Sequence, residues 1–341
     1  MTPRGNALIA WADFDGVVRA DVAGRGQPFG AVATDIGRAR LDAAAGLRVA
    51  ALADGRVLIL WSDAPRSRRL SARTPTNPGA LRLAVWTPGR GFARPRVVGA
   101  SATGPAVVAA PDATATLAWL SRGHLRVAHI AAGASAPGSP RTLGAASGPR
   151  ALLSRSPDGV LSAGWVAPGG HTLMTRPLGA GAPAAARLSF PATAGPITAV
   201  QFASGSAGRM VAGVQTAITR GANSLWTAAG SSAAGWDAPV LLGTPARFPS
   251  ISTPAAGVLA SGTPLLVWGA REPAHSGIAD VVAASDDGDA TVLDSASATF
   301  SNLDAAVAAG PNATALVWPA LARTGPSGQP LTGGVTIAVG T

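Results

Sequence analysis

Four stretches of the sequence share one design and decide the fold. Residues 109–119 read AAPDATATLAW, residues 154–165 read SRSPDGVLSAGW, residues 50–61 read AALADGRVLILW and residues 308–318 read AAGPNATALVW. In each, a turn sequence such as Pro157-Asp158-Gly159 precedes a run of small and apolar residues that ends at a tryptophan. A Pro-Asp or Asp-Gly turn ahead of an alternating run is typical of a tight β-hairpin. The stretches therefore predict the second strand of a recurring unit.

The same design recurs along the whole chain at a nearly constant period. Shorter versions end at Trp11 and Trp268, and a degenerate version without the tryptophan ends at Gln215. The seven ends fall at positions 11, 61, 119, 165, 215, 268 and 318, which are 46 to 58 residues apart. Self-similarity at a period of about 50 residues indicates a repeat architecture. Seven such units account for the chain.

Each unit predicts four short strands. After the tryptophan strand comes a third strand, as in residues 81–85, and then a Gly-aromatic turn that leads into a fourth, as in residues 96–98. No helix-period stretch of ten or more residues interrupts this order. We therefore predict an all-β fold, a single β-propeller domain over residues 1–341 with seven four-stranded blades of about 50 residues. The first unit starts at its second strand and the last stops after its third, so ring closure and a count of six or eight blades stay open.

The residue inventory excludes several chemistries. The chain has no Lys, no Cys and no Tyr, and Glu272 is its only glutamate. It therefore lacks a Schiff-base or P-loop lysine, a thiol nucleophile, a disulfide and a cysteine-ligated metal site. Hydrophobic residues make up 47% of the chain and the mean hydropathy is +0.28, enough to bury a large core. No apolar run approaches the roughly 20 residues of a membrane helix, and we expect no membrane span, no cofactor and a monomer.

Positive charge is concentrated in the first half of the chain. All 27 basic residues are arginines, the acidic residues number 17, and the net charge is +10. Residues 1–187 carry +13, whereas residues 188–341 carry −3. One interpretation is a basic surface for an anionic partner, and the other is the arginine-rich composition of a GC-rich genome. Nucleic acid is not the expected partner, because single-strand binders need aromatic platforms and aromatic residues make up only 5% of the chain.

The turns between third and fourth strands carry a resemblance to a known family. Residues 285–291 read SDDGDAT, and the turns Gly235-Trp236 and Gly91-Phe92 place an aromatic residue after glycine. The units thereby resemble those of sialidase-like (Asp-box) β-propellers, closest in style to uncharacterised propeller-repeat proteins of high-GC actinobacteria. That family joins these strands by a hairpin reading Ser-x-Asp-x-Gly-x-Thr-Trp, of which the chain keeps the Ser, the Asp and the Thr. Asp289 and Val292 replace the Gly and the Trp.

The resemblance has implications for location and activity. It implies a secreted or cell-envelope protein, although the N-terminal residues show no signal peptide and a cytoplasmic location stays open. The family's sialidases use a Tyr–Glu nucleophile pair, an aspartate acid/base and three arginines. This chain has no tyrosine, so the resemblance implies the fold rather than that catalysis.

Three long connections and one tight turn carry the candidate ligand-binding residues. They link the second and third strands of their units, and in a propeller these loops lie on one face together with the connections between blades. The candidates are Asp13 and Asp15 in the turn, Arg66, Arg68, Arg69 and Arg73 in residues 62–80, Arg271, Glu272 and His275 in residues 269–277, and Arg323 in residues 319–332. If the ring closes, these connections form one patch on one rim. The alternative is that they are tolerated, solvated insertions.

The tryptophans also have two interpretations. Large residues at one place in every unit are expected to pack between adjacent blades, and the alternative is an array that stacks on sugars. Trp86, Trp226 and Trp236 lie outside the repeat positions and are better binding candidates. Trp236 occupies the hairpin position of the resembled family, which favours a structural role for it.

Acidic and histidine pairs suggest metal sites only weakly. Asp13 with Asp15, and the acids of residues 286–289, are either turn formers or Ca²⁺ ligands, and neither completes a recognised loop. His124 and His129 are expected on opposite faces of one strand, where they do not pair as ligands. We therefore expect turn-forming aspartates and no metal.

The sequence favours a non-catalytic binding module that recognises a carbohydrate, a cell-envelope polymer or a protein through the long connections of one rim. Its partner is then an anionic glycan, an envelope polymer or a protein. The alternative is a propeller lyase or glycoside hydrolase that uses His275 as base near Glu272. A purely structural repeat without a ligand is the third hypothesis.

Overall fold

The structure is a computed structural model of the 341-residue chain. It describes residues 2, 5–13, 15–30, 33–39, 46–63, 79–179, 181–218, 222–243, 250–251, 253–259, 261–271, 278–284, 290–297, 306–309, 314–319 and 335–340. The chain divides into two compact units, unit 1 from Met1 to Leu153 and unit 2 from Ser154 to Thr341. Each unit is described by itself.

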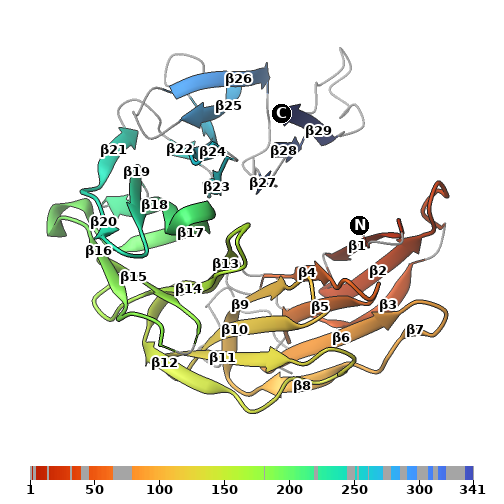
Figure 1. The fold of residues 1–341 in the computed structure, drawn as a ribbon. Helices are drawn as coiled ribbons and strands as arrows, with labels where there is room; N and C mark the ends of the chain where they lie inside the picture. Colours follow the sequence, from red (N-terminus) through yellow and green to blue (C-terminus); the bar gives the residue numbers. More distant parts are fainter. Residues whose placement is uncertain are drawn as a thin grey trace. The chain divides into compact units, whose positions relative to one another are not determined.

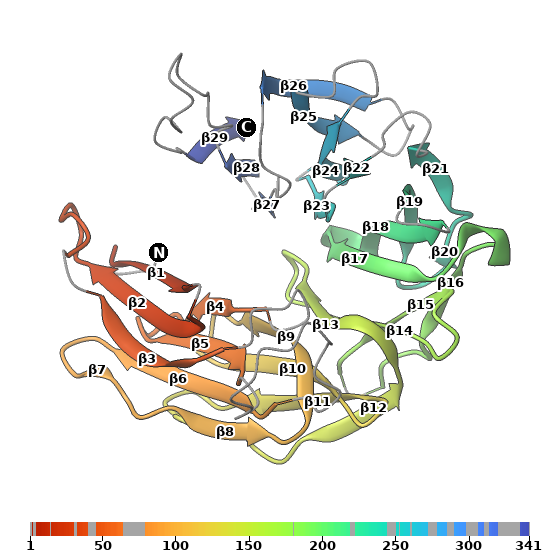
Figure 2. The same ribbon diagram turned by 180° about the vertical axis from the view of Figure 1, so that it is seen from behind.

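Both units are built from antiparallel β-sheets, as Figures 1 and 2 show. The helical elements in the described residues are two 3₁₀ turns, η1 (Ala192–Ala194) and η2 (Ser206–Gly208). Neither of them is long and apolar enough to cross a membrane. The all-β prediction is confirmed.

Unit 1 holds three sheets, named here by their order along the chain. Sheet 1 consists of β1 (Ala7–Ala12), β2 (Val17–Ala23) and β3 (Thr34–Arg38). Sheet 2 consists of β4 (Arg48–Ala51), β5 (Val57–Ser62), β6 (Leu81–Thr87), β7 (Gly91–Phe92) and β8 (Arg96–Gly99). Sheet 3 consists of β9 (Ala102–Ala109), β10 (Ala115–Ser121), β11 (His124–Ile130) and β12 (Arg141–Ala145).

Sheets 4 to 7 follow in the same manner. Sheet 4 has β13 (Ser147–Arg155), on which the division between the units falls, then β14 (Leu161–Val166), β15 (Thr172–Pro177) and β16 (Ala186–Ser189). Sheet 5 has β17 (Ile197–Ser204), β18 (Arg209–Ile218), β19 (Ala222–Ser231), β20 (Gly235–Trp236) and β21 (Val240–Gly243). Sheet 6 has β22 (Ser250–Ile251), β23 (Ala255–Val258), β24 (Pro264–Arg271), β25 (Ile278–Ala284) and β26 (Ala290–Ser297). Sheet 7 has β27 (Ala306–Ala309), β28 (Thr314–Pro319) and β29 (Val335–Gly340).

The sheets coincide with the predicted sequence units. Each of the seven aligned positions lies on the second strand of its unit, from Trp11 on β1 to Trp318 on β28. Within the described residues, sheet 1 starts at this tryptophan strand and sheet 7 stops one strand after it, as the repeat pattern predicts. Whether the sheets close into a ring stays a prediction.

The predicted turn chemistry is visible in the first hairpins of the units. The Asp112 carboxylate accepts hydrogen bonds from the Thr114 amide at 3.0 Å and from the Thr114 hydroxyl at 2.7 Å. Asp54 accepts the Arg56 amide at 3.1 Å in the same way. Gly159 has a φ of 89°, which glycine adopts without strain. These aspartates and glycines therefore close the turns that start the tryptophan strands.

Two repeat tryptophans are fully buried against a neighbouring sheet. Trp61 is 0% and Trp119 is 2% exposed. A Cβ atom added to Gly37 would lie 2.5 Å from Cζ2 of Trp61, and one added to Gly99 would lie 2.8 Å from Nε1 of Trp119. The Trp61 indole N–H also donates to the Arg38 carbonyl at 2.9 Å. Each ring thus packs on a glycine of the fourth strand of the preceding sheet, and the packing prediction is confirmed for both.

This glycine coincides with a β-bulge in the fourth strand. An apolar residue followed by glycine recurs at Gly37, Gly99, Gly144 and Gly243, and the register between third and fourth strands shifts beside each one. In sheet 4 the residue after the apolar Leu188 is Ser189 instead of glycine, the register is regular, and the next sheet has Gln215 in place of the tryptophan. Sheet 6 keeps the shift with Asp294 at this place. In sheets 1 to 5, therefore, a sheet that has the bulge and the glycine in its fourth strand is followed by a sheet with the repeat tryptophan, and sheet 4, which lacks both, is followed by a sheet without it.

One hydrogen bond recurs between the sheets and marks the same end of each of sheets 1 to 4. The amides of Ala39, Ala102, Ala146 and Ile197 each donate at 2.8 Å to the carbonyl of a glycine, namely Gly16, Gly79, Gly123 and Gly170 respectively. Each bond ties the segment that leads into the next sheet to the turn between the second and third strands. These turns and the connections between sheets therefore lie on the same side of sheets 1 to 4, as predicted. We call this side the connection face.

Candidate functional site

Two of the ten candidate residues lie in a turn that the structure describes, and they are Asp13 and Asp15. Arg271 is the last residue of β24, and its backbone is described. The others, Arg66, Arg68, Arg69, Arg73, Glu272, His275 and Arg323, lie outside the described residues.

The long connection of sheet 2 starts and ends at the connection face. Ser62 pairs with Leu81 at the last position of the β5–β6 ladder, and the Asp63 amide donates to the Ala80 carbonyl at 2.7 Å. The sequence prediction that residues 62–80 join second and third strands is thus confirmed. The ladders of sheets 6 and 7 place the other two long connections in the same way, after Arg271 opposite Ala279 and after Pro319 opposite Val335.

Asp13 stabilises its own turn at the connection face of sheet 1. One carboxylate oxygen, Oδ1, accepts the amides of Asp15 at 3.1 Å and of Val17 at 2.8 Å. The Gly16 amide donates to the Asp13 carbonyl at 2.9 Å, and Arg38 Nη1 donates to the Asp15 carbonyl at 3.4 Å. The turn-forming interpretation of Asp13 is therefore confirmed.

The second oxygen of the Asp13 carboxylate belongs to a three-strand polar network. Arg19 Nη1 lies 2.7 Å from Asp13 Oδ2, and Arg19 Nε donates to Asp35 Oδ1 at 2.9 Å. The hydrogen bond that Arg19 donates to Asp35 raises the pKa of Arg19 most. Burial lowers this pKa, and the negative charges of Asp13, Asp35 and Asp15 raise it further, so the net shift is upward. Side-chain exposure is 38% for Arg19, 20% for Asp13 and 62% for Asp35. The network offers both donors and acceptors to solvent.

A tryptophan lies beside this network on the same face of sheet 1. Trp11 is directly opposite Arg19 in the β1–β2 ladder, and directly opposite residues share a face. Trp11 is 36% exposed, whereas its equivalents Trp61 and Trp119 are buried. Sheet 1 therefore combines a partly exposed indole with a guanidinium and two carboxylates.

The pairing of tryptophan with arginine is a property of sheets 1 to 3. The opposite pairs are Trp11 with Arg19, Trp61 with Arg82, and Trp119 with Arg126. In unit 2 the residues at the arginine place are Met174, Leu225, Val282 and Thr336. In sheet 2 an aspartate again follows the tryptophan by two residues, and Arg82 Nε lies 2.7 Å from Asp63 Oδ2. Sequence reasoning missed Arg19, Asp35, Asp63 and Arg82, although the Trp-x-Asp spacing was a visible signal for Asp63.

Comparison with known proteins identifies the fold and no family. No protein-family model matches the chain, and no curated protein matches it either. Among solved structures it is similar to the polysaccharide lyase Uly1, with a TM-score of 0.56 and 11% identity over 99% of this chain and 88% of that one. A protein of unknown function from Dyadobacter fermentans gives 0.54 and 13%, over 87% of this chain and 94% of that one.

A variant of the NanB sialidase from Streptococcus pneumoniae is a third similar structure. Its TM-score is 0.50 and its identity 9%, over 81% of this chain and 65% of the sialidase. Identities this low concern the fold alone. The chain therefore has the all-β, propeller-like architecture of these proteins, as the resemblance implied.

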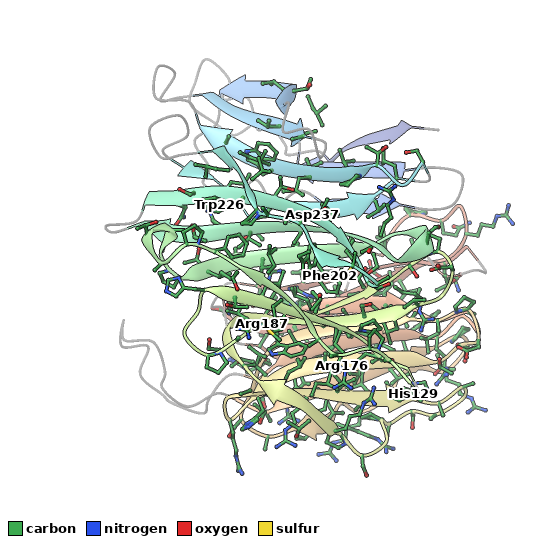
Figure 3. All side chains as sticks on the ribbon, turned by 60° about the vertical axis from the view of Figure 1, so that its left-hand side comes forward. His129, Arg176, Arg187, Phe202, Trp226 and Asp237 are labelled. Atoms are coloured by element: carbon green, nitrogen blue, oxygen red, sulfur yellow. The ribbon has the colours of Figure 1, made fainter. Side chains whose placement is uncertain are left out.

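Two of the three tryptophans outside the repeat positions, Trp226 and Trp236, make side-chain contacts within the protein. The Trp236 indole N–H donates to the Thr175 hydroxyl at 2.9 Å, from the β20 turn of sheet 5 to sheet 4. The Trp226 indole N–H, on β19 (Figure 3), donates to the Thr216 hydroxyl at 3.1 Å, and its ring meets Phe190 edge-on at 6.0 Å. These contacts favour structural roles for both and agree with the structural interpretation of Trp236.

Candidate metal ligands do not gather in the part of the chain that the structure describes. No three His, Asp or Glu side chains come together there, and residues 286–289 lie outside it. His124 pairs with Ser121 and His129 with Thr116 in the β10–β11 ladder, five positions apart, so the two imidazoles lie on opposite faces as predicted. His124 Nδ1 instead contacts the Arg122 carbonyl at 2.9 Å.

Proposed function

We propose that the chain is a single β-propeller of seven four-stranded blades that binds a carbohydrate without transforming it. The recurring hydrogen bonds at the connection face and the tryptophan–glycine contacts between sheets support this blade arrangement. In a closed ring the connections of blades 6, 7, 1 and 2 become neighbours. Trp11 stays accessible in the proposed ring because the described part of sheet 7 has no fourth strand to cover it as β3 covers Trp61. The ligand-binding surface of the proposal is the connection face.

The observation that carries the proposal is the arrangement of Trp11, Arg19, Asp13 and Asp35 on one face of sheet 1. A sugar presents an apolar C–H face and a ring of hydroxyl groups, each of which both donates and accepts hydrogen bonds. An exposed indole matches the C–H face. The guanidinium donates, the carboxylates accept, and their mutual ion pairs hold them in fixed directions. Few other ligands need both properties within one small area.

We propose that the long connection of sheet 2 adds further arginines to the ligand-binding surface. Residues 63–80 start and end at the connection face, where Asp63 is hydrogen-bonded to Ala80. In the proposal, the four arginines of this connection surround the sheet 1 site with positive charge, which suits a carboxylate-bearing glycan. They are Arg66, Arg68, Arg69 and Arg73. Arg271, Glu272, His275 and Arg323 join the same patch if the ring closes.

The absence of catalysis in the proposal rests on the residue inventory. The chain has no tyrosine, lysine or cysteine and one glutamate, so the usual pair of flanking carboxylates would have to be built mainly from aspartates. The similar structures of a polysaccharide lyase and a sialidase support a carbohydrate as the ligand class. A lyase or hydrolase that uses His275 and Glu272 is the competing hypothesis. We further propose that the protein acts outside the cell or in its envelope.

A glycan screen with paired variants tests the proposal. The purified chain is applied to an array of neutral and acidic glycans, followed by the Trp11→Ala and Arg19→Ala variants. Arg187→Ala, which removes an exposed arginine of β16, is the matched control. We expect the wild type and the control to bind the same glycan, and both site variants to lose it while their melting temperatures stay within a few degrees. Unchanged binding by the site variants would refute the assignment.

A further inference from the structure

The outer part of sheet 2 and all of sheet 3 are strongly basic. Residues 79–146 are all described, and they contain seven arginines and a single acid, Asp112, for a net charge of +6. The Asp112 carboxylate accepts hydrogen bonds from the Thr114 amide and hydroxyl within its own turn. This part of the chain therefore carries positive charge with almost no local compensation.

Six of these arginines have no polar partner for their guanidinium within the described part of the chain. They are Arg90, Arg94, Arg96, Arg122, Arg126 and Arg141. All except the half-buried Arg126 are exposed. Other arginines of unit 1 differ, because Arg19 and Arg56 are each held by an aspartate 2.7 Å away. The unpaired guanidinium groups are thus concentrated in sheets 2 and 3. We call the three exposed arginines on or beside the outer strands β8 and β12, namely Arg94, Arg96 and Arg141, the cationic surface.

Two members of the cationic surface occupy equivalent positions on neighbouring outer strands. Arg96 starts β8 and is opposite Leu83, and Arg141 starts β12 and is opposite Val127. Each strand pairs with only one other strand, so both form the outer edges of their sheets (Figures 1 and 2).

Sheets 2 and 3 are in direct contact, so β8 and β12 are the outer strands of adjacent sheets. A Cβ atom on Gly99 of β8 would overlap Trp119 of β10, and the Ser121 hydroxyl donates to the Ala100 carbonyl at 3.0 Å. The exposed His129 lies on β11 beside β12 and is labelled in Figure 3. The repeat therefore places Arg96 and Arg141 at equivalent positions on the outer strands of two adjacent sheets.

We propose that the cationic surface binds a linear polysaccharide that carries carboxylate or sulfate groups. Guanidinium groups form paired hydrogen bonds with such anions, and a row of unpaired arginines matches the regular charge spacing of an acidic polymer. This site is separate from the proposed connection-face site and does not depend on it.

The residues around these arginines argue against nucleic acid as the partner. Single-stranded nucleic acids bind through exposed aromatic rings on which bases stack. In residues 79–146 the aromatic residues are Trp86, Phe92 and Trp119, of which the first two are half-buried and the third is buried. Double-stranded nucleic acids need an element that enters a groove, whereas β8 and β12 are strands of four and five residues at sheet edges. Charge without stacking favours the polysaccharide.

The test measures the affinity of the full chain for defined polymers. Polygalacturonate supplies carboxylates, dextran sulfate supplies sulfates, neutral dextran is the uncharged reference, and DNA oligomers, single-stranded and duplex, are the competing class. The variant is the triple Arg94→Ala, Arg96→Ala, Arg141→Ala. Its control is the triple Arg25→Ala, Arg187→Ala, Arg209→Ala, which removes three exposed arginines outside the cationic surface. The control variant and the test variant therefore have the same net charge.

We expect at least one acidic polymer to bind and neutral dextran not to bind. The test triple should lose roughly 100-fold in affinity at about 50 mM salt, on about a fivefold effect for each of the three surface charges. The dependence of log affinity on log salt should become shallower by up to about 2. The control triple should lose less than about threefold, since none of its three arginines belongs to the cationic surface. Failure of both acidic polymers to bind, an equal loss in the control, or tighter binding of DNA would each overturn the proposal.

Discussion

The contact between a repeat tryptophan and a fourth-strand glycine predicts a specific pattern of stability. In Gly99→Ser the new Cβ would lie 2.8 Å from Nε1 and 3.0 Å from Cε2 of Trp119, a ring that is 2% exposed and has little room to move. Overpacking of this kind costs about 1 to 3 kcal/mol. Trp119→Gln removes most of a buried indole and costs about 3 to 5 kcal/mol.

The double variant distinguishes this contact from two independent effects. Ser and Gln are the residues that the chain itself has at Ser189 and Gln215, the equivalent pair of sheets 4 and 5. In Gly99→Ser with Trp119→Gln the new side chain occupies space that the indole has left. The combined loss should therefore be smaller than the sum of the single losses by at least about 1 kcal/mol.

Urea denaturation followed by circular dichroism gives the free energy of unfolding of each variant. Gly179→Ala is the control, because Gly179 is exposed and a Cβ there would meet nothing within 4 Å. This control should stay within about 0.5 kcal/mol of the wild type. Strict additivity of the two substitutions, or a Gly99→Ser variant as stable as the wild type, would refute the reasoning.

Three further predictions concern the turn, the hairpin aromatic and catalysis. Asp13→Ala removes the acceptor of two turn amides, so the free energy of unfolding measured by urea denaturation should fall by about 1 kcal/mol. Asp15→Ala is the control and should show no such fall, because the two turn amides are bonded to Asp13 and not to Asp15. Trp236→Phe leaves the Thr175 hydroxyl, 1% exposed, without its donor, and calorimetry should show a loss of about 1 to 3 kcal/mol. Incubation with any bound glycan should release no product by mass spectrometry, and release that disappears in His275→Ala would establish the competing lyase or hydrolase.

The periodic features of the fold were predictable from the sequence because they are local. A turn motif and an alternating strand within a dozen residues define the tryptophan strand of each unit. The positions of the third and fourth strands follow from the order of strands and turns that recurs in every unit. The predicted packing of Trp61 and Trp119 also follows, since a large residue at one place in every unit needs one common environment.

The candidate site was less predictable because it depends on strand register and bulges. Arg19 joins Asp13 and Asp35 only because residues 18 and 19 of β2 pair across the bulge of β3. A slip of one residue would turn Arg19 to the other face of the sheet. The glycine that receives the next tryptophan is equally hidden, because it acts between sheets about 20 residues apart in sequence. Asp13 was recognised as a turn former, but its ion pair with Arg19 was not.

Isothermal titration of the glycan selected by the array, into the wild type and into Trp11→Ala, tests the central claim most directly. The account predicts a saturable heat of binding for the wild type, with the glycan recovered intact, and at least a tenfold weaker affinity for the folded variant, since a lost stacking contact of about 1.4 kcal/mol corresponds to that factor. Equal affinities for the two proteins, or a cleaved glycan, would contradict it.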